Sequence, residues 1–200
     1  MAAVGSLAEG LCITDLGSEI AAADDAAAAL AADQIVAWFQ GRMEYGPRAL
    51  GNRSILANPL IPDIKDRLNR IIKLREGFRP FAPAVAIAHA REYFDFAASS
   101  MFDYMLASCP VTPEWRDRLP GITRVDGSAR MQTVDPERNP LFHQVISTFG
   151  QIAGVYCLVN TSFNVRGQPI IVSPEIAIET FRKVDIDRLY LGSVRLSKQA

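Results

Sequence analysis

The chain has 200 residues, of which 49% are hydrophobic and 22% are charged, a balance typical of a globular protein with one core. Its net charge is -1 at pH 7 and its pI is about 6.1, so no overall positive field attracts nucleic acid or an anionic membrane. Any anion-binding site must therefore be local.

The three cysteines, Cys12, Cys109 and Cys157, lie far apart, and the chain has only two histidines to join them. This spacing argues against a zinc site or a disulfide framework, and we expect buried thiols in a reducing compartment. The first ten residues contain no basic segment followed by an apolar run, and no stretch of about eighteen apolar residues occurs. We therefore expect a soluble, cytoplasmic protein without a metal site.

The N-terminal quarter of the chain changes character twice. Residues 1–16 are rich in Gly, Ala and Ser, which predicts a linker or disordered arm before a single domain over 17–200. The alanine-rich segment 20–34 is a strong helix former. The run "IVAWF" (35–39) then predicts a buried strand, and "SILAN" (54–58) predicts a second one.

The rest of the chain mixes helices and strands without strict alternation. In its first part we expect a helix at 63–73, a strand at 81–88, a helix at 89–94 and a strand at 104–108. A hairpin at 122–134, turning at Asp126-Gly127, and a helix at 140–152 follow. We then expect strands at 155–159 and 169–173, a helix capped by Ser173 with Pro174 in its first turn, and a final strand at 188–192. This order favours an α/β fold with a mixed twisted sheet and flanking helices.

The segment "GRMEYGPRALGNRS" (41–54) combines three glycines and a proline with three arginines. The stretch 41–79 holds nine basic and four acidic residues, a local charge of +5. Arginine forks match phosphate oxygens, so this charge suggests a phosphate-sized anion, although salt bridges to acids elsewhere are the alternative. We expect at least one of Arg42, Arg48 and Arg53 to be structural, because three guanidinium groups would crowd a single phosphate.

The next motif, "KLREGFRP", places Lys73, Arg75 and Arg79 at positions i, i+2 and i+6. In an extended segment these positions point to one side, so the three cations can converge on one point.

The loop "NTSFNVRG" (160–167) follows a predicted strand. It puts Asn160, Ser162 and Asn164 on one side of an extended segment, with Arg166 in the same phase. Hydroxyl and amide groups can bind phosphate, ribose or a small amide, but such residues in loops also commonly cap turns.

Four segments together resemble a known family. "GRMEYGPRALGNRSILANP", "REGFRPFAPAV", "VDGSARMQTV" and "NTSFNVRGQPIIVSPEIAIETF" are similar to the C-terminal YrdC-like domain of NodU/TobZ/CmcH-type O-carbamoyltransferases, over about residues 34–195. That family joins this domain to an N-terminal ASKHA-type domain. Nothing in these 200 residues supplies the histidine metal ligands or the phosphate loops of that domain, so we expect the chain to be a fragment of a larger enzyme. The resemblance implies that ATP and carbamoyl phosphate are bound, with Mg²⁺ as the usual aid, to form carbamoyl adenylate. The partner domain would then transfer the carbamoyl group to a hydroxyl acceptor.

The resemblance also implies roles for particular residues. The KxR pattern of YrdC-like proteins matches Lys73 and Arg75, and their SxN pattern matches Ser162 and Asn164. With Arg79, the KxR pair forms the expected catalytic set. The other arginines expected around phosphate or carbamoyl oxygens are Arg48, Arg130 and Arg166.

Two other functions compete with this interpretation. One is an RNA-binding YrdC-like module, which the acidic pI and the scarcity of lysine make a poor fit, because binding to a phosphate backbone needs many dispersed cations. The other is a non-catalytic interaction domain that only closes over its partner's site.

Overall fold

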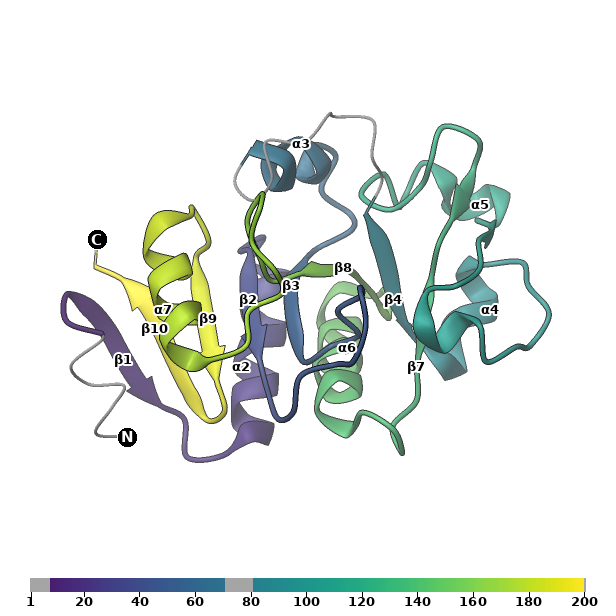
Figure 1. Ribbon diagram of the computed structural model, residues 1–200. Helices are drawn as coiled ribbons and strands as arrows, with labels where there is room; N and C mark the ends of the chain where they lie inside the picture. The colour runs from purple at the N-terminus through teal and green to yellow at the C-terminus, as the bar shows by residue number, and fades with distance from the viewer. Residues whose placement is uncertain (1–7, 71–80, 200) are drawn as a thin grey trace.

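The computed structural model describes residues 8–70 and 81–199 (Figure 1). The strands are β1 (Leu11–Asp15), β2 (Val36–Phe39), β3 (Arg53–Ala57), β4 (Ala82–Ala86), β5 (Cys109–Pro110), β6 (Ser128–Ala129), β7 (Gln132–Val134), β8 (Cys157–Ser162), β9 (Arg188–Leu191) and β10 (Val194–Lys198). The α-helices are α2 (Glu19–Ala31), α3 (Ile64–Leu68), α4 (Ala90–Tyr93), α5 (Pro113–Arg116), α6 (Pro140–Ala153) and α7 (Pro174–Lys183), and short 3-10 turns are η2 (Ile87–His89) and η3 (Phe102–Tyr104).

Eight of the described strands form one sheet in the order β1-β10-β9-β2-β3-β8-β4-β7. The pairs β2 with β9 and β4 with β7 are parallel, and the other neighbouring pairs are antiparallel. The expected mixed sheet with flanking helices is therefore confirmed.

The sheet lies between two layers. Helices α2 and α6 cover one face, and α7 lies on the other (Figure 1). Strand β2 shows how the sequence produces this arrangement: Val36 and Trp38 pack with α2 and α6, whereas Ala37 and Phe39 belong to the core on the opposite face. Successive strand residues point to opposite faces, so a strand with both faces covered is apolar throughout.

The alanine-rich helix α2 packs closely on α6. Its first turn is capped by Ser18, whose hydroxyl accepts a hydrogen bond from the amide of Ala21 (3.1 Å). The buried alanines Ala22, Ala23 and Ala26 have no bulk to keep the helices apart. The predicted cap of α7 is likewise confirmed, because the Ser173 hydroxyl accepts from the amide of Ile176 (3.4 Å) and Pro174 occupies the first turn.

The strands at one edge of the sheet differ from the prediction in two ways. Leu11–Asp15, within the segment expected to be a linker or disordered arm, forms β1 and pairs antiparallel with β10. The strand at 188–192 is not the last: β9 turns through Gly192, at φ 58°, into β10. A Gly-Ser pair between two apolar runs is a hairpin signal, and β10 then supplies the open edge on which β1 pairs.

Three further predictions in the loops are wrong. Residues 104–108 form no strand, because Met105 has a left-handed backbone (φ 55°) and Leu106 closes a turn onto Met101. Residues 169–173 form no strand. The turn at Asp126-Gly127 exists, but the flanking strands do not pair as a hairpin: β6 pairs with β5, and β7 pairs in parallel with β4. Long-range pairing overrode the local alternation in this segment.

Candidate functional site

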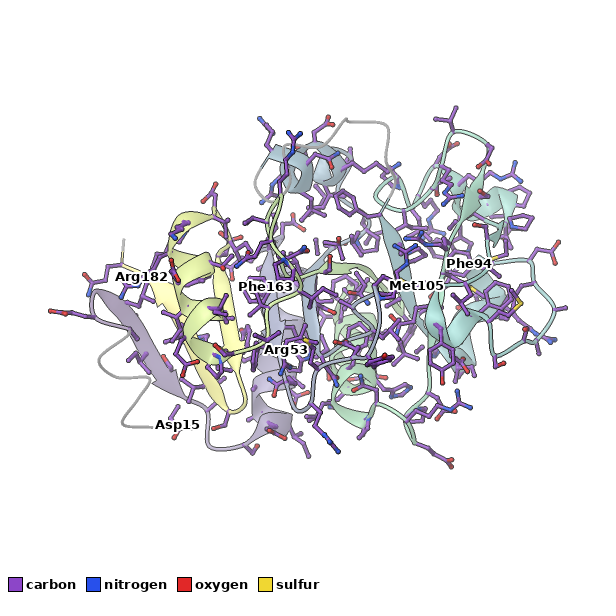
Figure 2. All side chains as sticks on the ribbon, viewed as in Figure 1. Asp15, Arg53, Phe94, Met105, Phe163 and Arg182 are labelled. Atoms are coloured by element: carbon purple, nitrogen blue, oxygen red, sulfur yellow. The ribbon has the colours of Figure 1, made fainter. Side chains whose placement is uncertain are left out.

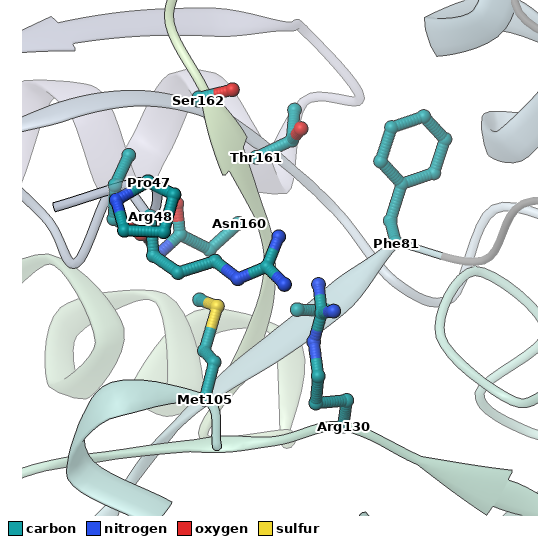
Figure 3. Close-up of a pocket in the computed structure, with 10 residues that line it drawn as sticks. Pro47, Arg48, Phe81, Met105, Arg130, Asn160, Thr161 and Ser162 are labelled. Atoms are coloured by element: carbon teal, nitrogen blue, oxygen red, sulfur yellow. Dashed lines mark hydrogen bonds between the residues drawn. The ribbon is translucent and has the colours of Figure 1, made fainter. Parts of the chain in front are cut away.

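A small cavity opens where the end of β8 meets the loop between β2 and β3. Its volume is about 100 Å³, and Figure 3 shows its lining. The described residues that line it are Pro47, Arg48, Ala49, Phe81, Ala82, Met105, Arg130, Asn160, Thr161 and Ser162. It brings together three of the predicted binding residues, Arg48, Arg130 and Ser162, and the described lining contains no carboxylate.

Two guanidinium groups face each other across this cavity. Arg48 reaches in from the β2–β3 loop and Arg130 from the segment just before β7 (Figure 3). Burial lowers the pKa of Arg130 below its usual value, and the nearby positive charges of Arg48 and Arg124 lower it further. No ion pair among the described residues involves Arg48 or Arg130, and the buried Nε of Arg130 has no hydrogen-bond partner there. Such a concentration of positive charge favours a bound anion.

Buried amides hold the loop that carries Arg48. The Asn160 side-chain amide donates to the carbonyl oxygen of Ala49 (3.2 Å) and to the side-chain oxygen of Gln132 (2.8 Å). Gln132 in turn donates to the carbonyl oxygen of Leu50 (2.8 Å). Sequence reasoning missed Gln132, since a single buried amide in a strand leaves no periodic or charge signal.

Glu44 closes the same loop from its other end. One carboxylate oxygen accepts hydrogen bonds from the amides of Leu50 and Asn52, each at 2.7 Å. The backbone turns that this closure needs occur at glycines: Gly46 has φ 131° and Gly51 has φ 114°. The loop is therefore a closed unit that presents Arg48, as the density of glycines suggested.

The three arginines of the opening segment have different surroundings. Arg53 is buried and donates to the carbonyl oxygens of Gln40 (2.7 Å), Gly41 (3.0 Å) and Asn52 (3.0 Å). Its guanidinium carbon also lies 3.4 Å from the centre of the Phe39 ring. Arg53 therefore has a structural role, as expected for at least one of the three arginines. Arg42 is exposed and is not among the described lining residues.

The SxN residues separate at the end of β8. Ser162 lines the cavity, and its hydroxyl donates to the side-chain oxygen of Asn164 (2.7 Å). The Asn164 amide donates to the carbonyl oxygen of Gln168 (2.6 Å), which shapes the loop, and Asn164 is not among the described lining residues. Arg166 is exposed and does not line the cavity either. The role predicted for these two residues in binding stays a prediction.

Lys73, Arg75 and Arg79 lie outside the described residues. Their predicted catalytic role stays a prediction. In the sequence, Arg79 lies two positions before Phe81, which lines the cavity.

The cysteines differ in exposure. Cys109 and Cys157 are buried as expected, and burial raises the pKa of Cys109 to about 11. Cys12 is exposed, so the expectation of three buried thiols is wrong for it. Within 8–70 and 81–199, no group of three or more His, Cys, Asp or Glu side chains is arranged to hold a metal ion.

No helix in the described part of the chain combines the length and the apolar character needed to cross a membrane.

The sequence matches known proteins over most of its length. It is 44% identical over 186 residues to the nodulation protein NolNO of Sinorhizobium fredii, which covers 90% of this chain and 27% of that protein. It is 45% identical over 145 residues to a 3'-hydroxymethylcephem-O-carbamoyltransferase of Streptomyces clavuligerus, covering 72% of this chain and 26% of that protein. The chain thus spans little more than a quarter of the length of either relative.

A solved structure and a family model complete the comparison. Full-length HypF in its phosphate- and nucleotide-bound form has a similar fold, with a TM-score of 0.58 at 20% identity, over 85% of this chain and 24% of that one. The family model described as "Carbamoyltransferase C-terminus" matches residues 27–198. The resemblance to NodU-type carbamoyltransferases is confirmed, and the chain belongs to the carbamoyltransferase C-terminus family.

Proposed function

We propose that this chain is the adenylate-forming part of an O-carbamoyltransferase. It binds ATP and carbamoyl phosphate and forms carbamoyl adenylate, and an N-terminal ASKHA-type domain transfers the carbamoyl group to a hydroxyl acceptor. Membership of the carbamoyltransferase C-terminus family supports carbamoyl transfer in general. So do relatives named as O-carbamoyltransferases.

The observation that carries the proposal is the pair of guanidinium groups of Arg48 and Arg130 in one cavity. The described lining holds no carboxylate to neutralise them, and the Nε of the half-buried Arg130 lacks a partner among the described residues. A phosphate or carbamoyl oxygen would accept hydrogen bonds from both groups. Asn160 and Ser162 lie in the same lining, but the Asn160 amide donates to Ala49 and Gln132 and the Ser162 hydroxyl donates to Asn164, so the two guanidinium groups carry the proposed anion binding.

The proposed chemistry needs this positive charge. Water cleaves carbamoyl phosphate into carbamate and inorganic phosphate. A carbamate oxygen then attacks the α-phosphorus of ATP, and pyrophosphate leaves as the bond to the β-phosphate breaks. Both reactants are anions, so the site must cancel their repulsion and stabilise the charge that develops at phosphorus. Arg48 and Arg130 would supply this, and we expect Lys73, Arg75 and Arg79 to add to it.

The described lining does not fit a magnesium ion held by the protein. Mg²⁺ prefers carboxylate and phosphate oxygens, and no carboxylate lines the cavity among the described residues. The expected Mg²⁺ would then arrive on the nucleotide phosphates, and no step above depends on it.

Titration of ATP, then of carbamoyl phosphate, into the chain tests the proposal, with Arg48→Met as the variant and Arg42→Met as its matched control. Both changes remove one exposed guanidinium from the same loop, but only Arg48 lines the cavity. We expect Arg48→Met to weaken ATP binding about tenfold or more, the value of a charge-assisted hydrogen bond, and Arg42→Met to have little effect. Equal effects of the two changes would instead indicate a nonspecific charge effect.

The KxR motif is tested by the same titration. Lys73→Ala and Arg75→Ala should each reduce affinity by about 1.5 to 3 kcal/mol without unfolding the protein. If the unmodified chain binds no ATP under any condition, the non-catalytic interaction domain becomes the better interpretation.

A further inference from the structure

Gln132 connects the two segments of chain that carry Arg48 and Arg130, the arginines of the proposed anion site. It is the first residue of β7 and only 4% of its surface is exposed. Its side-chain amide donates to the carbonyl oxygen of Leu50 (2.8 Å), and its side-chain oxygen accepts from Asn160 (2.8 Å). Leu50 is two residues after Arg48, so Gln132 ties β7 directly to the loop that carries this arginine.

Arg130 belongs to the same segment of chain as Gln132. The two residues are separated by one position, and in extended chain such residues point to the same side. The guanidinium of Arg130 indeed faces Arg48 (Figure 3), and the amide of Gln132 reaches Leu50. This short segment therefore supplies Arg130 to the cavity, and through Gln132 it also holds the loop that carries Arg48.

The side-chain amides of Gln132 and Asn160 hold the Arg48 loop without adding negative charge to the site. Elsewhere in this protein two arginines, Arg188 and Arg195, are held by the carboxylate of Asp25, which neutralises part of their charge. Glu44 also holds the Arg48 loop, through the backbone amides of Leu50 and Asn52, but its carboxylate is not among the described residues that line the cavity. Next to the cavity, the loop is held by the neutral amides of Gln132 and Asn160, which donate to the carbonyl oxygens of Leu50 and Ala49. Two guanidinium groups repel each other, so their separation must be set by contacts of this kind when the cavity holds no anion.

We propose that Gln132 is a positioning residue that sets the separation of Arg48 and Arg130 and thereby the affinity for a phosphoanhydride. This role rests on the proposed function, because it requires that the two arginines bind phosphate groups. Gln132 itself does not touch the ligand: it acts through the position of the loop that carries Arg48.

The test compares Gln132→Met with Gln144→Met, using inorganic pyrophosphate and ATP as probes in isothermal titrations. Methionine has about the same volume as glutamine but neither donates nor accepts strongly. Gln144 is a matched control because its amide donates to Asp24 (2.9 Å) and to Thr148 (3.2 Å), between α2 and α6 and away from the cavity lining. We expect both variants to lose some thermal stability and only Gln132→Met to bind the probes about tenfold more weakly.

A double-mutant cycle distinguishes positioning from general loosening. If Gln132 acts through Arg48, then Gln132→Met should cause little further loss of affinity in an Arg48→Met background. If the two losses simply add, or if Gln132→Met binds both probes as tightly as the unmodified chain, the positioning role is overturned while the proposed function stands.

Gln132→Asn extends the test should the methionine variant fail to fold. Its side chain stays uncharged but is one methylene shorter, so it cannot keep both the contact with Leu50 and the contact with Asn160; weaker binding supports the role and unchanged binding overturns it. If the unmodified chain binds neither pyrophosphate nor ATP, the proposed function fails, and the positioning role fails with it.

Discussion

The role of each arginine in the segment 41–54 depends on the acceptors within its reach. Arg53 lies among three backbone carbonyl groups and against the face of Phe39. Burial lowers the pKa of Arg53, and the charge of Glu44 opposes this shift. Arg48 has no ion-pair partner among the described residues and reaches the cavity. The two terminal nitrogens of Arg53 donate within the fold although its Nε has no partner among the described residues, whereas the guanidinium of Arg48 faces the cavity and can bind a ligand.

Replacing Arg53 with methionine should reduce stability more than any change at Arg48. It would leave the carbonyl oxygens of Gln40 and Gly41 without this donor and remove the contact with Phe39, at a cost of about 3 kcal/mol. Urea unfolding of Arg53→Met and Arg48→Met measures the difference. A loss of less than about 0.5 kcal/mol in Arg53→Met would contradict the structural role.

At the scale of elements, one carboxylate joins helix α2 to two strands. Asp25 accepts hydrogen bonds from Tyr190 of β9 (2.5 Å) and from Arg195 of β10 (2.9 Å), and it pairs with Arg188 (3.2 Å). Burial alone would raise its pKa, but the hydrogen bonds and charges of these three partners outweigh burial and lower it below the usual value.

This lowered pKa predicts an acid-sensitive contribution to stability. A carboxyl group with a lower pKa in the folded state stabilises the fold at any pH above its unfolded pKa, about 3.9, and this stabilisation is lost as the pH falls through the folded pKa. Asp25→Asn should therefore be less stable than the unmodified chain at pH 7, by about 1 to 3 kcal/mol, and the difference should shrink below pH 4. Unfolding by urea at pH 7 and at pH 3 measures both values.

Asp117→Asn is the control, because it removes an exposed carboxylate. If the unfolding free energies of Asp25→Asn and the unmodified chain differ by the same amount at both pH values, the carboxylate of Asp25 is not the source of the acid sensitivity.

The β2–β3 loop also packs tightly against helix α6. Gly51 has φ 114°, and a Cβ atom added there would lie 2.2 Å from the ring of Phe142, which is fully buried. Gly51→Ala should therefore cost about 2 to 4 kcal/mol, from backbone strain and overpacking together. Gly167 is a matched control with φ 80° and no atom within 4 Å of the added Cβ, so Gly167→Ala should cost only about 1 to 2 kcal/mol. Equal thermal shifts in the two variants would argue against the close contact with Phe142.

The sequence predicted the sheet better than it predicted the loops. The helices around α2, α6 and α7 and the core strands follow from apolar runs, capping residues and alanine content, which are local signals. The strand expected at 104–108 fails because of a local turn at Met105, which the apolar run does not reveal. The hairpin at 122–134 fails because β6 and β7 pair with strands elsewhere in the sequence. The site divides in the same way: charged residues such as Arg48 and Arg130 stand out in the sequence, whereas the buried amide of Gln132 is recognised only by its partners.

The described residues that line the cavity come from one half of the eight-stranded sheet and the loops at its end. Strands β8 and β4 and the segment before β7 lie in one lateral half of the sheet. Strands β1, β9 and β10, together with α7, lie in the other half (Figure 1). Labelled side chains follow this division: Met105 lies toward the cavity side, and Asp15 and Arg182 lie at the far edge (Figure 2). The proposed site thus lies in one half of the sheet.

At the scale of the whole molecule, we predict that adenylate formation and carbamoyl transfer are separable. The chain covers 27% of NolNO and 26% of the cephem O-carbamoyltransferase, and the described cavity lining contains neither a carboxylate nor a histidine to act as a general base for an acceptor hydroxyl. Given ATP, Mg²⁺ and carbamoyl phosphate, the chain should release pyrophosphate or support its exchange into ATP, yet carbamoylate no acceptor. Adding the N-terminal domain in trans, with an acceptor, should then restore transfer.

Arg48→Met provides the control for this reconstitution. Because the proposed role of Arg48 is in adenylate formation, the variant should lower pyrophosphate release and transfer by the same factor, whereas a defect confined to domain docking would lower transfer alone. Transfer by the chain without the added domain would overturn the division of labour. Transfer that proceeds normally while pyrophosphate release is abolished would overturn the adenylate itself, because the carbamoyl group would then reach the acceptor by another route.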